Sequence, residues 1–125
     1  MRAVARTVLY VGNDPLLSKS TCGLLRANGF GARTCLPANI RLMLRNVKFQ
    51  AVVLCATIAA EEADQVVEVL SEEQPQTPIV SIHVGLLGDT PHPASTYVVD
   101  ALAGPNALIS AMKSAMSQQC ATESA

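Results

Sequence analysis

The sequence predicts a single α/β domain in which helices cover a five-stranded parallel sheet. Short, β-rich apolar runs alternate along the chain with amphipathic segments of helical periodicity, the pattern of repeated strand–helix–strand units. The run at 51–56 (AVVLCA) is apolar throughout, as expected for a strand buried on both faces of a parallel sheet. A chain of 125 residues fits one domain with one core.

The N-terminal part predicts a strand followed by a helix. Residues 7–11 (TVLYV) favour a strand, and Pro15 suits the first turn of a helix that Asn13 or Asp14 would cap. Asn28-Gly29 favours the end of this helix, because both residue types tolerate the left-handed conformation. The residues that recur at helical spacing in this segment are Leu17, Thr21, Leu24 and Leu25.

The middle of the chain repeats this order. Residues 30–35 predict a second strand, Pro37 opens a second helix, the run at 51–56 forms a third strand, and Pro75 ends a third helix. The expected inward positions are Ile40, Met43, Leu44 and Val47 in the second helix, and Ala63, Val66, Val67 and Leu70 in the third.

The C-terminal part completes the sheet. Residues 77–83 and 96–99 predict the last two strands, and the Gly/Pro-rich segment 84–95 between them indicates a loop with little room for a helix. Pro105 opens a final helix with Leu108, Ile109, Met112 and Met116 inward, and the tail after Gln118 is expected to fray. We therefore expect one domain over 1–125, with its core at about 7–117 and a flexible C-terminal tail.

Right-handed crossovers in a chain of this size favour the flavodoxin-like strand order 2-1-3-4-5. Apolar residues make up 50% of the chain, and no apolar run reaches the roughly 18 residues of a membrane span. No secretory signal pattern is present, so we expect a cytoplasmic protein. The four cysteines form no CxxC pair and have no zinc-type spacing, which predicts buried reduced thiols and neither a metal nor a cofactor.

Charge divides the chain. Residues 1–50 carry eight basic side chains and one acid, whereas residues 51–125 carry nine acids and one lysine. Arg41, Arg45 and Lys48 recur at i, i+4 and i+7, which predicts a basic ridge on the second helix. This ridge could be a solvated face, could pair with the acidic third helix, or could contact a partner. Because no DNA-binding motif is present, we expect no nucleic-acid partner.

Four features in this order resemble the response-regulator receiver (CheY-like) family: the runs VLYVGNDPLL, FQAVVLCA and TPIVSI, and the helix opened by Pro105. The resemblance extends from about Thr7 to Met116, nearly the whole chain. It implies a receiver fold and a role in two-component (phosphorelay) signal transduction. It also implies a signalling partner such as a histidine kinase or an output protein.

The chain departs from this family at the phosphorylation site. The two magnesium-binding acids of the family correspond to Gly12 and Asn13, and the phosphoacceptor aspartate corresponds to Cys55. The family's hydroxyl residue corresponds to His83, and its lysine falls near Asp100. The family's fourth helix is expected to be short or missing. Because phosphoryl transfer needs a metal and cations to neutralise charge, we expect a pseudo-receiver that acts through protein contacts and is not an enzyme.

Two alternatives remain open from the sequence. The chain could be an atypical response regulator that a kinase still phosphorylates, with Asp14 as the remaining carboxylate, although Asp14 suits helix capping better. It could also be a small thiol enzyme in which His83 activates Cys55 and Asp100 orients the histidine. A buried thiol beside a hydrogen-bonded imidazole is the simpler interpretation. The high apolar content is also compatible with a homodimer.

Overall fold

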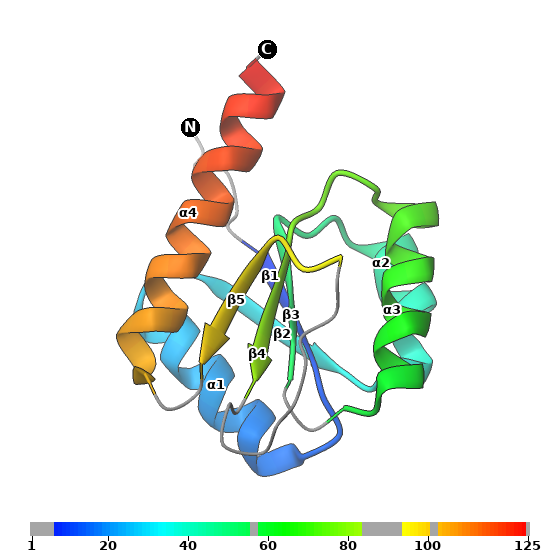
Figure 1. The fold of residues 1–125 in the computed structure, drawn as a ribbon, viewed down its shortest axis with the longest axis horizontal. Coiled ribbons are helices and arrows are strands. Elements are labelled where there is room, and N and C mark those ends of the chain that lie inside the picture. Colours follow the sequence, from blue (N-terminus) through cyan, green and yellow to red (C-terminus); the bar gives the residue numbers. More distant parts are fainter. Residues whose placement is uncertain (1–6, 56–57, 84–93, 101–102, 125) are drawn as a thin grey trace.

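The computed structural model describes residues 7–55, 58–83, 94–100 and 103–124. Its strands form one parallel sheet in the order β2-β1-β3-β4-β5, which confirms the predicted topology (Figure 1). The strands are β1 (Thr7–Val11), β2 (Gly31–Cys35), β3 (Ala51–Leu54), β4 (Ile79–His83) and β5 (Tyr97–Asp100). The helices are α1 (Pro15–Ala27), the 3-10 turn η1 (Pro37–Asn39), α2 (Ile40–Asn46), α3 (Ala60–Glu73) and α4 (Pro105–Ser124).

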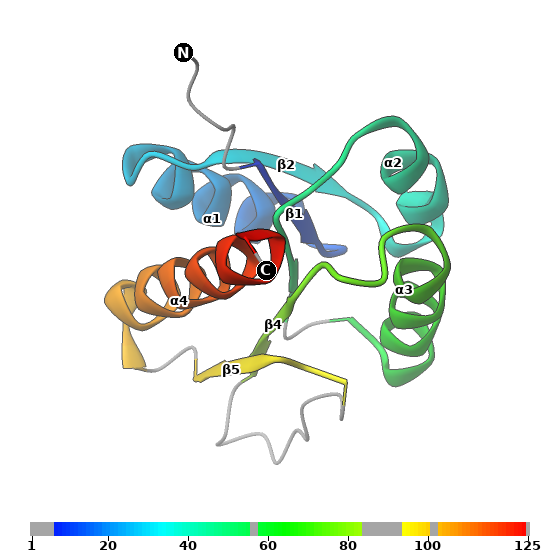
Figure 2. The same ribbon diagram turned by 90° about the horizontal axis from the view of Figure 1, so that it is seen from above.

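The sheet is the middle of three layers. Helices α1 and α4 cover one face, and α2 and α3 cover the other, as the view from above shows (Figure 2). Alternation along β1 sends Val8 and Tyr10 into the cluster under α1 and α4, and Leu9 and Val11 into the cluster under α2 and α3. The middle strand β3 is therefore apolar at every position because both faces of the sheet are covered there.

Helix α1 has the predicted ends but a different inward face. The Asp14 carboxylate accepts hydrogen bonds from the backbone N–H groups of Leu16 (2.9 Å) and Leu17 (3.3 Å), and Gly29 adopts φ +90° after the helix. Leu17, one of the residues at helical spacing, does not lie inward, since it is 42% exposed. The buried positions of the helix are Ser18, Cys22 and Leu25. Ser18 and Cys22 are small, so apolar periodicity did not mark them.

Gln74 joins the ends of α2 and α3. Its Nε2 donates to the carbonyl oxygens of Leu44 (2.8 Å) and Val47 (2.7 Å), and its Oε1 accepts from the Phe49 N–H (3.0 Å). One side chain thus satisfies three backbone groups of the α2–β3 connection, which would otherwise lose hydrogen bonds on folding. Of the predicted inward positions, Ile40 and Leu44 in α2 and Val66 and Leu70 in α3 are buried, and Val69 joins them.

Two predictions concern the C-terminal half. The structure continues α4 to Ser124, where the composition predicts a frayed tail, and the last turns of the helix extend past the sheet (Figure 1). Residues 84–93, where the fourth helix of the family was expected to be short or missing, lie outside the described residues. No helix in the described part of the chain is both long and apolar enough to cross a membrane.

Candidate functional site: the carboxyl edge of the sheet

The positions of the expected site meet at one edge of the sheet. Gly12 and Asn13 follow β1, Cys55 follows β3, and His83 and Asp100 end β4 and β5, where they are register partners. Because all five strands are parallel, their carboxyl ends share this edge, which is where open α/β sheets bind ligands. The fold thus brings the predicted residues to one end of the molecule, and the local contacts decide what they can do.

The Tyr10 ring and Cys55 both lie close to Gly12. A Cβ atom placed at residue 12 would lie 3.0 Å from Cε1 of the Tyr10 ring and 3.1 Å from Cβ of Cys55. Tyr10 is 2% exposed and Cys55 is 6% exposed, and both belong to the apolar cluster under α1 and α4. A side chain at residue 12 would therefore require a shift of the buried ring or of Cys55.

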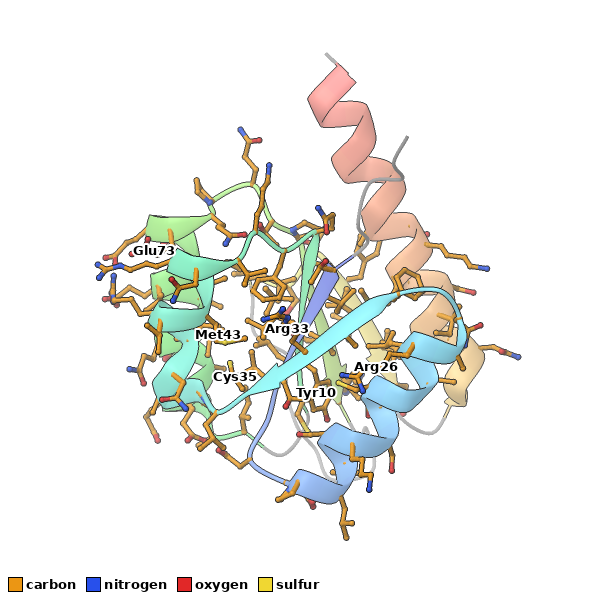
Figure 3. All side chains as sticks on the ribbon, turned by 180° about the vertical axis from the view of Figure 1, so that it is seen from behind. Tyr10, Arg26, Arg33, Cys35, Met43 and Glu73 are labelled. Atoms are coloured by element: carbon orange, nitrogen blue, oxygen red, sulfur yellow. The ribbon has the colours of Figure 1, made fainter. Side chains whose placement is uncertain are left out.

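The same contacts keep Tyr10 in its neutral form. Burial of the ring and a hydrogen bond with Cys55 raise the pKa of the Tyr10 hydroxyl above its ordinary value, and a hydrogen bond with Thr21 opposes the shift. Figure 3 labels Tyr10 where it lies between the sheet and α1. This surrounding disfavours charge, whereas a phosphorylation site has to stabilise it.

The polar groups beside Gly12 have other partners. Asn13 Nδ2 donates to Glu62 Oε1 (3.0 Å), which also accepts from the Ala59 N–H (3.0 Å) at the start of α3. The Asp14 carboxylate caps α1. Among the described residues no group of three His, Cys, Asp or Glu side chains could hold a metal ion.

Cys55 and His83 lie on opposite faces of the sheet. Cys55, Val80 and Ile82 pack in the cluster under α1 and α4, whereas Ile79 packs under α2 and α3. Alternation along β4 places His83 on the same face as Ile79 and therefore away from Cys55. This placement does not favour the Cys–His pair that the sequence left open as an alternative. Nδ1 of His83 is buried and has no hydrogen-bond partner among the residues that the structure describes.

The basic ridge is largely neutralised within the molecule. Arg41 contacts Glu72 (2.8 Å) and Glu73 (3.2 Å), and Arg45 Nε lies 3.0 Å from the same Glu73 oxygen that Arg41 contacts. Glu73 is labelled in Figure 3 at the end of α3, beside α2. Of the alternatives left open by the sequence, pairing with the acidic third helix holds for Arg41 and Arg45. Lys48 lies beyond the end of α2.

Two further thiols line the α1–β2 side of this edge. Burial raises the pKa of Cys22, although the positive charge of Arg26 opposes the shift, and burial raises the pKa of Cys35 to about 11. Both side chains are therefore neutral thiols near pH 7, which are poor nucleophiles.

No protein-family model matches this sequence, and no curated protein matches it significantly. Solved structures do match. A response regulator receiver protein from Sinorhizobium medicae shares 23% identity at a TM-score of 0.74, covering 92% of this chain and 97% of that one. The chain has the receiver fold. A CheY-like receiver domain protein from Methanospirillum hungatei shares 13% identity at a TM-score of 0.77, covering 93% and 97% of the two chains.

Full-length FixJ from B. japonicum shares 16% identity at a TM-score of 0.74. The match covers 94% of this chain but only 60% of FixJ, so the receiver fold makes up part of that protein. At such identities the comparisons show the fold that was predicted from the order of the sequence motifs.

The sequence did not identify Tyr10 as a residue of this site. The only local signal was an aromatic residue within TVLYV, which strand propensity alone explains. Alternation from a buried strand would have placed Tyr10 and Gly12 on one face, but the closeness of Cys55 depends on the pairing of β1 with β3.

Proposed function

We propose that this chain is a receiver-like module of two-component signalling that is not phosphorylated and acts through contacts with proteins. The observation that supports this proposal most directly is the packing of Tyr10 against Gly12 and Cys55 at the position of the family's phosphoacceptor. The receiver fold favours a signalling role, and a neutral, filled pocket disfavours magnesium-dependent phosphoryl transfer. The proposed partner is a histidine kinase or an output protein.

The outer surface of α2 is a candidate contact for such a partner. Leu42 is 66% exposed, and the Arg45 side chain on the same helix is 61% exposed although it contacts Glu73. An apolar side chain beside a guanidinium is the kind of pair that protein interfaces use. On this surface Arg41 and Arg45 belong to an ion-pair network with α3, and they do not form a ridge of unpaired cations.

Incubation with acetyl phosphate and Mg²⁺, followed by intact-mass measurement, tests the absence of phosphorylation. We expect no added phosphoryl group on the wild-type protein under conditions that label an ordinary receiver. A stable phosphorylated product would refute the proposal, and loss of that product in Cys55→Ala would identify the acceptor.

Affinity capture from the native cell tests the protein contacts. We expect Cys55→Ala to retain the captured signalling partner and Leu42→Glu to lose it, with Ser20→Glu on the exposed surface of α1 as a matched control. Capture that depends on Cys55 in a folded variant would instead favour the atypical phosphorylated regulator.

A further inference from the structure

A cavity of about 400 Å³ lies between α1 and the end of β2, and it reaches the site described above, since Gly12 and Asn13 are among its lining residues. Ser18, Lys19, Cys22 and Arg26 form its α1 wall, with spacings that place them along one side of the helix. Thr34, Cys35 and Leu36 form the opposite wall. The volume falls within the range of roughly 300–1,000 Å³ that is typical of small-molecule sites.

The cavity exists because α1 turns small side chains toward β2. Ser18 and Cys22 occupy inward positions of the helix, whereas the neighbouring Leu16 and Leu17 are 77% and 42% exposed. A helix with large residues at the inward positions would fill the space against the edge strand. The arrangement of large and small residues thus leaves a hollow next to the sheet.

The charged residues that line the cavity are both cationic. Lys19 and Arg26 line it, no carboxylate residue does, and residues 15–35 contain no Asp or Glu. Arg26 Nη2 donates to the Ala32 carbonyl oxygen (2.7 Å), which holds the guanidinium between α1 and β2 (Figure 3). Lys19 forms no ion pair with any residue in the described part of the chain. A concave surface with one sign of charge attracts ions of the opposite sign.

The two cations lie seven residues apart on α1, which corresponds to about 10 Å along the helix axis. Ser18 and Thr34, which carry hydroxyl groups, also line the cavity, and Leu36 adds an apolar side chain to its wall. Arginine, lysine and hydroxyl donors together are the chemistry that recognises phosphate groups. We propose that this cavity binds a small molecule with an extended phosphate chain, by reversible contacts and without transfer of a phosphoryl group.

This proposal does not depend on a protein partner, and NMR tests it directly. The ¹⁵N-labelled protein is titrated without Mg²⁺ with sodium tripolyphosphate, and separately with ATP. We expect saturable shifts of the backbone amides of Ser18, Lys19 and Thr34 with both probes. Similar affinities would assign recognition to the phosphate chain alone, and tighter ATP binding with an added shift at Leu36 would assign it to a nucleotide.

Charge-reversal variants distinguish specific binding in the cavity from general electrostatic attraction of anions to the protein. Lys19→Glu should weaken tripolyphosphate binding by about tenfold or more, because it removes one cation and adds a repulsive charge. Lys113→Glu makes the same change at an exposed position of α4, and it should alter the affinity by no more than about twofold. Unsaturable shifts, or equal weakening by the two variants, would overturn the proposal.

Discussion

The Tyr10 ring and Cys55 both lie against Gly12, at 3.0 Å and 3.1 Å from the point where a Cβ atom of residue 12 would sit. This contact joins the end of β1 to the end of β3 at the carboxyl edge of the sheet. The positions that the resemblance assigns to a magnesium-binding acid and to the phosphoacceptor are here a glycine and a thiol, and the Tyr10 ring packs against both. The loss of activity proposed above is therefore a matter of packing as well as of missing carboxylates.

Gly12→Ala is expected to destabilise the protein by about 1–3 kcal/mol, because the added methyl group overpacks a site bounded by a buried ring. Gly12 does not have a positive φ, so the effect comes from packing and not from the backbone. Urea unfolding measures the change. Gly23→Ala is the control: Gly23 lies in α1 with no atom near its missing Cβ, and alanine there should stabilise the protein by about 0.5–1 kcal/mol. Equal effects of the two substitutions would contradict the packing argument.

Gln74→Ala is expected to lower the unfolding free energy by about 2–4 kcal/mol, since it leaves the carbonyl groups of Leu44 and Val47 and the N–H of Phe49 without this partner. Chemical denaturation monitored by circular dichroism measures the loss. Gln76→Ala removes an exposed amide two residues along the chain and should have almost no effect. If Gln74→Ala left the unfolding free energy almost unchanged, water would be replacing the three hydrogen bonds.

Tyr10→Phe is expected to flatten the loss of stability at alkaline pH. The folded-state pKa of Tyr10 is raised above the ordinary value of 10.0, so its contribution is complete below pH 10. As the pH rises above 10, the unfolded chain ionises first and the unfolding free energy of the wild type falls. Between pH 8 and 11 the wild type should lose about 1 kcal/mol more than Tyr10→Phe in urea unfolding. Parallel pH profiles would mean that the hydroxyl ionises equally in both states.

Glu73→Gln is expected to lower the Tm by no more than about 3 °C, because partly exposed ion pairs contribute little. The variant removes the carboxylate that Arg41 and Arg45 share. The difference from the wild type should shrink in 1 M NaCl, which screens such pairs. Glu68→Gln, on the exposed surface of the same helix, controls for the change in net charge. A large, salt-independent loss would show that Glu73 stabilises the α2–α3 contact by packing instead.

Much of the fold could be predicted because its signals are local. The strand at 7–11, the Asp14 cap and the glycine after α1 depend on residues close together in the chain. Pro75 correctly marks the end of α3, since proline cannot continue the helix. The order of these signals also predicted the 2-1-3-4-5 sheet, and that sheet brings Gly12 and Cys55 to one edge.

The side of α1 that faces inward could not be predicted in this way. Leu17 is apolar and Ser18 is polar, yet the structure exposes the first and buries the second. Burial there depends on how the helix lies against β2 and on the space that a small residue leaves. The cavity with Lys19 and Arg26 follows from the same arrangement, so no local pattern indicated it.

The sequence by itself determined the succession of strands and helices, the ends of α1, and the absence of acids at Gly12 and Cys55. Only the tertiary structure decided that Tyr10 and Cys55 both lie against Gly12, that Cys55 and His83 point to opposite faces, and that Arg41 and Arg45 pair with Glu73. The physical reason is the separation along the chain over which each kind of interaction acts. Propensity, capping and periodicity act between near neighbours in the chain, whereas these contacts join residues far apart in sequence, and sheet pairing and helix packing determine their geometry.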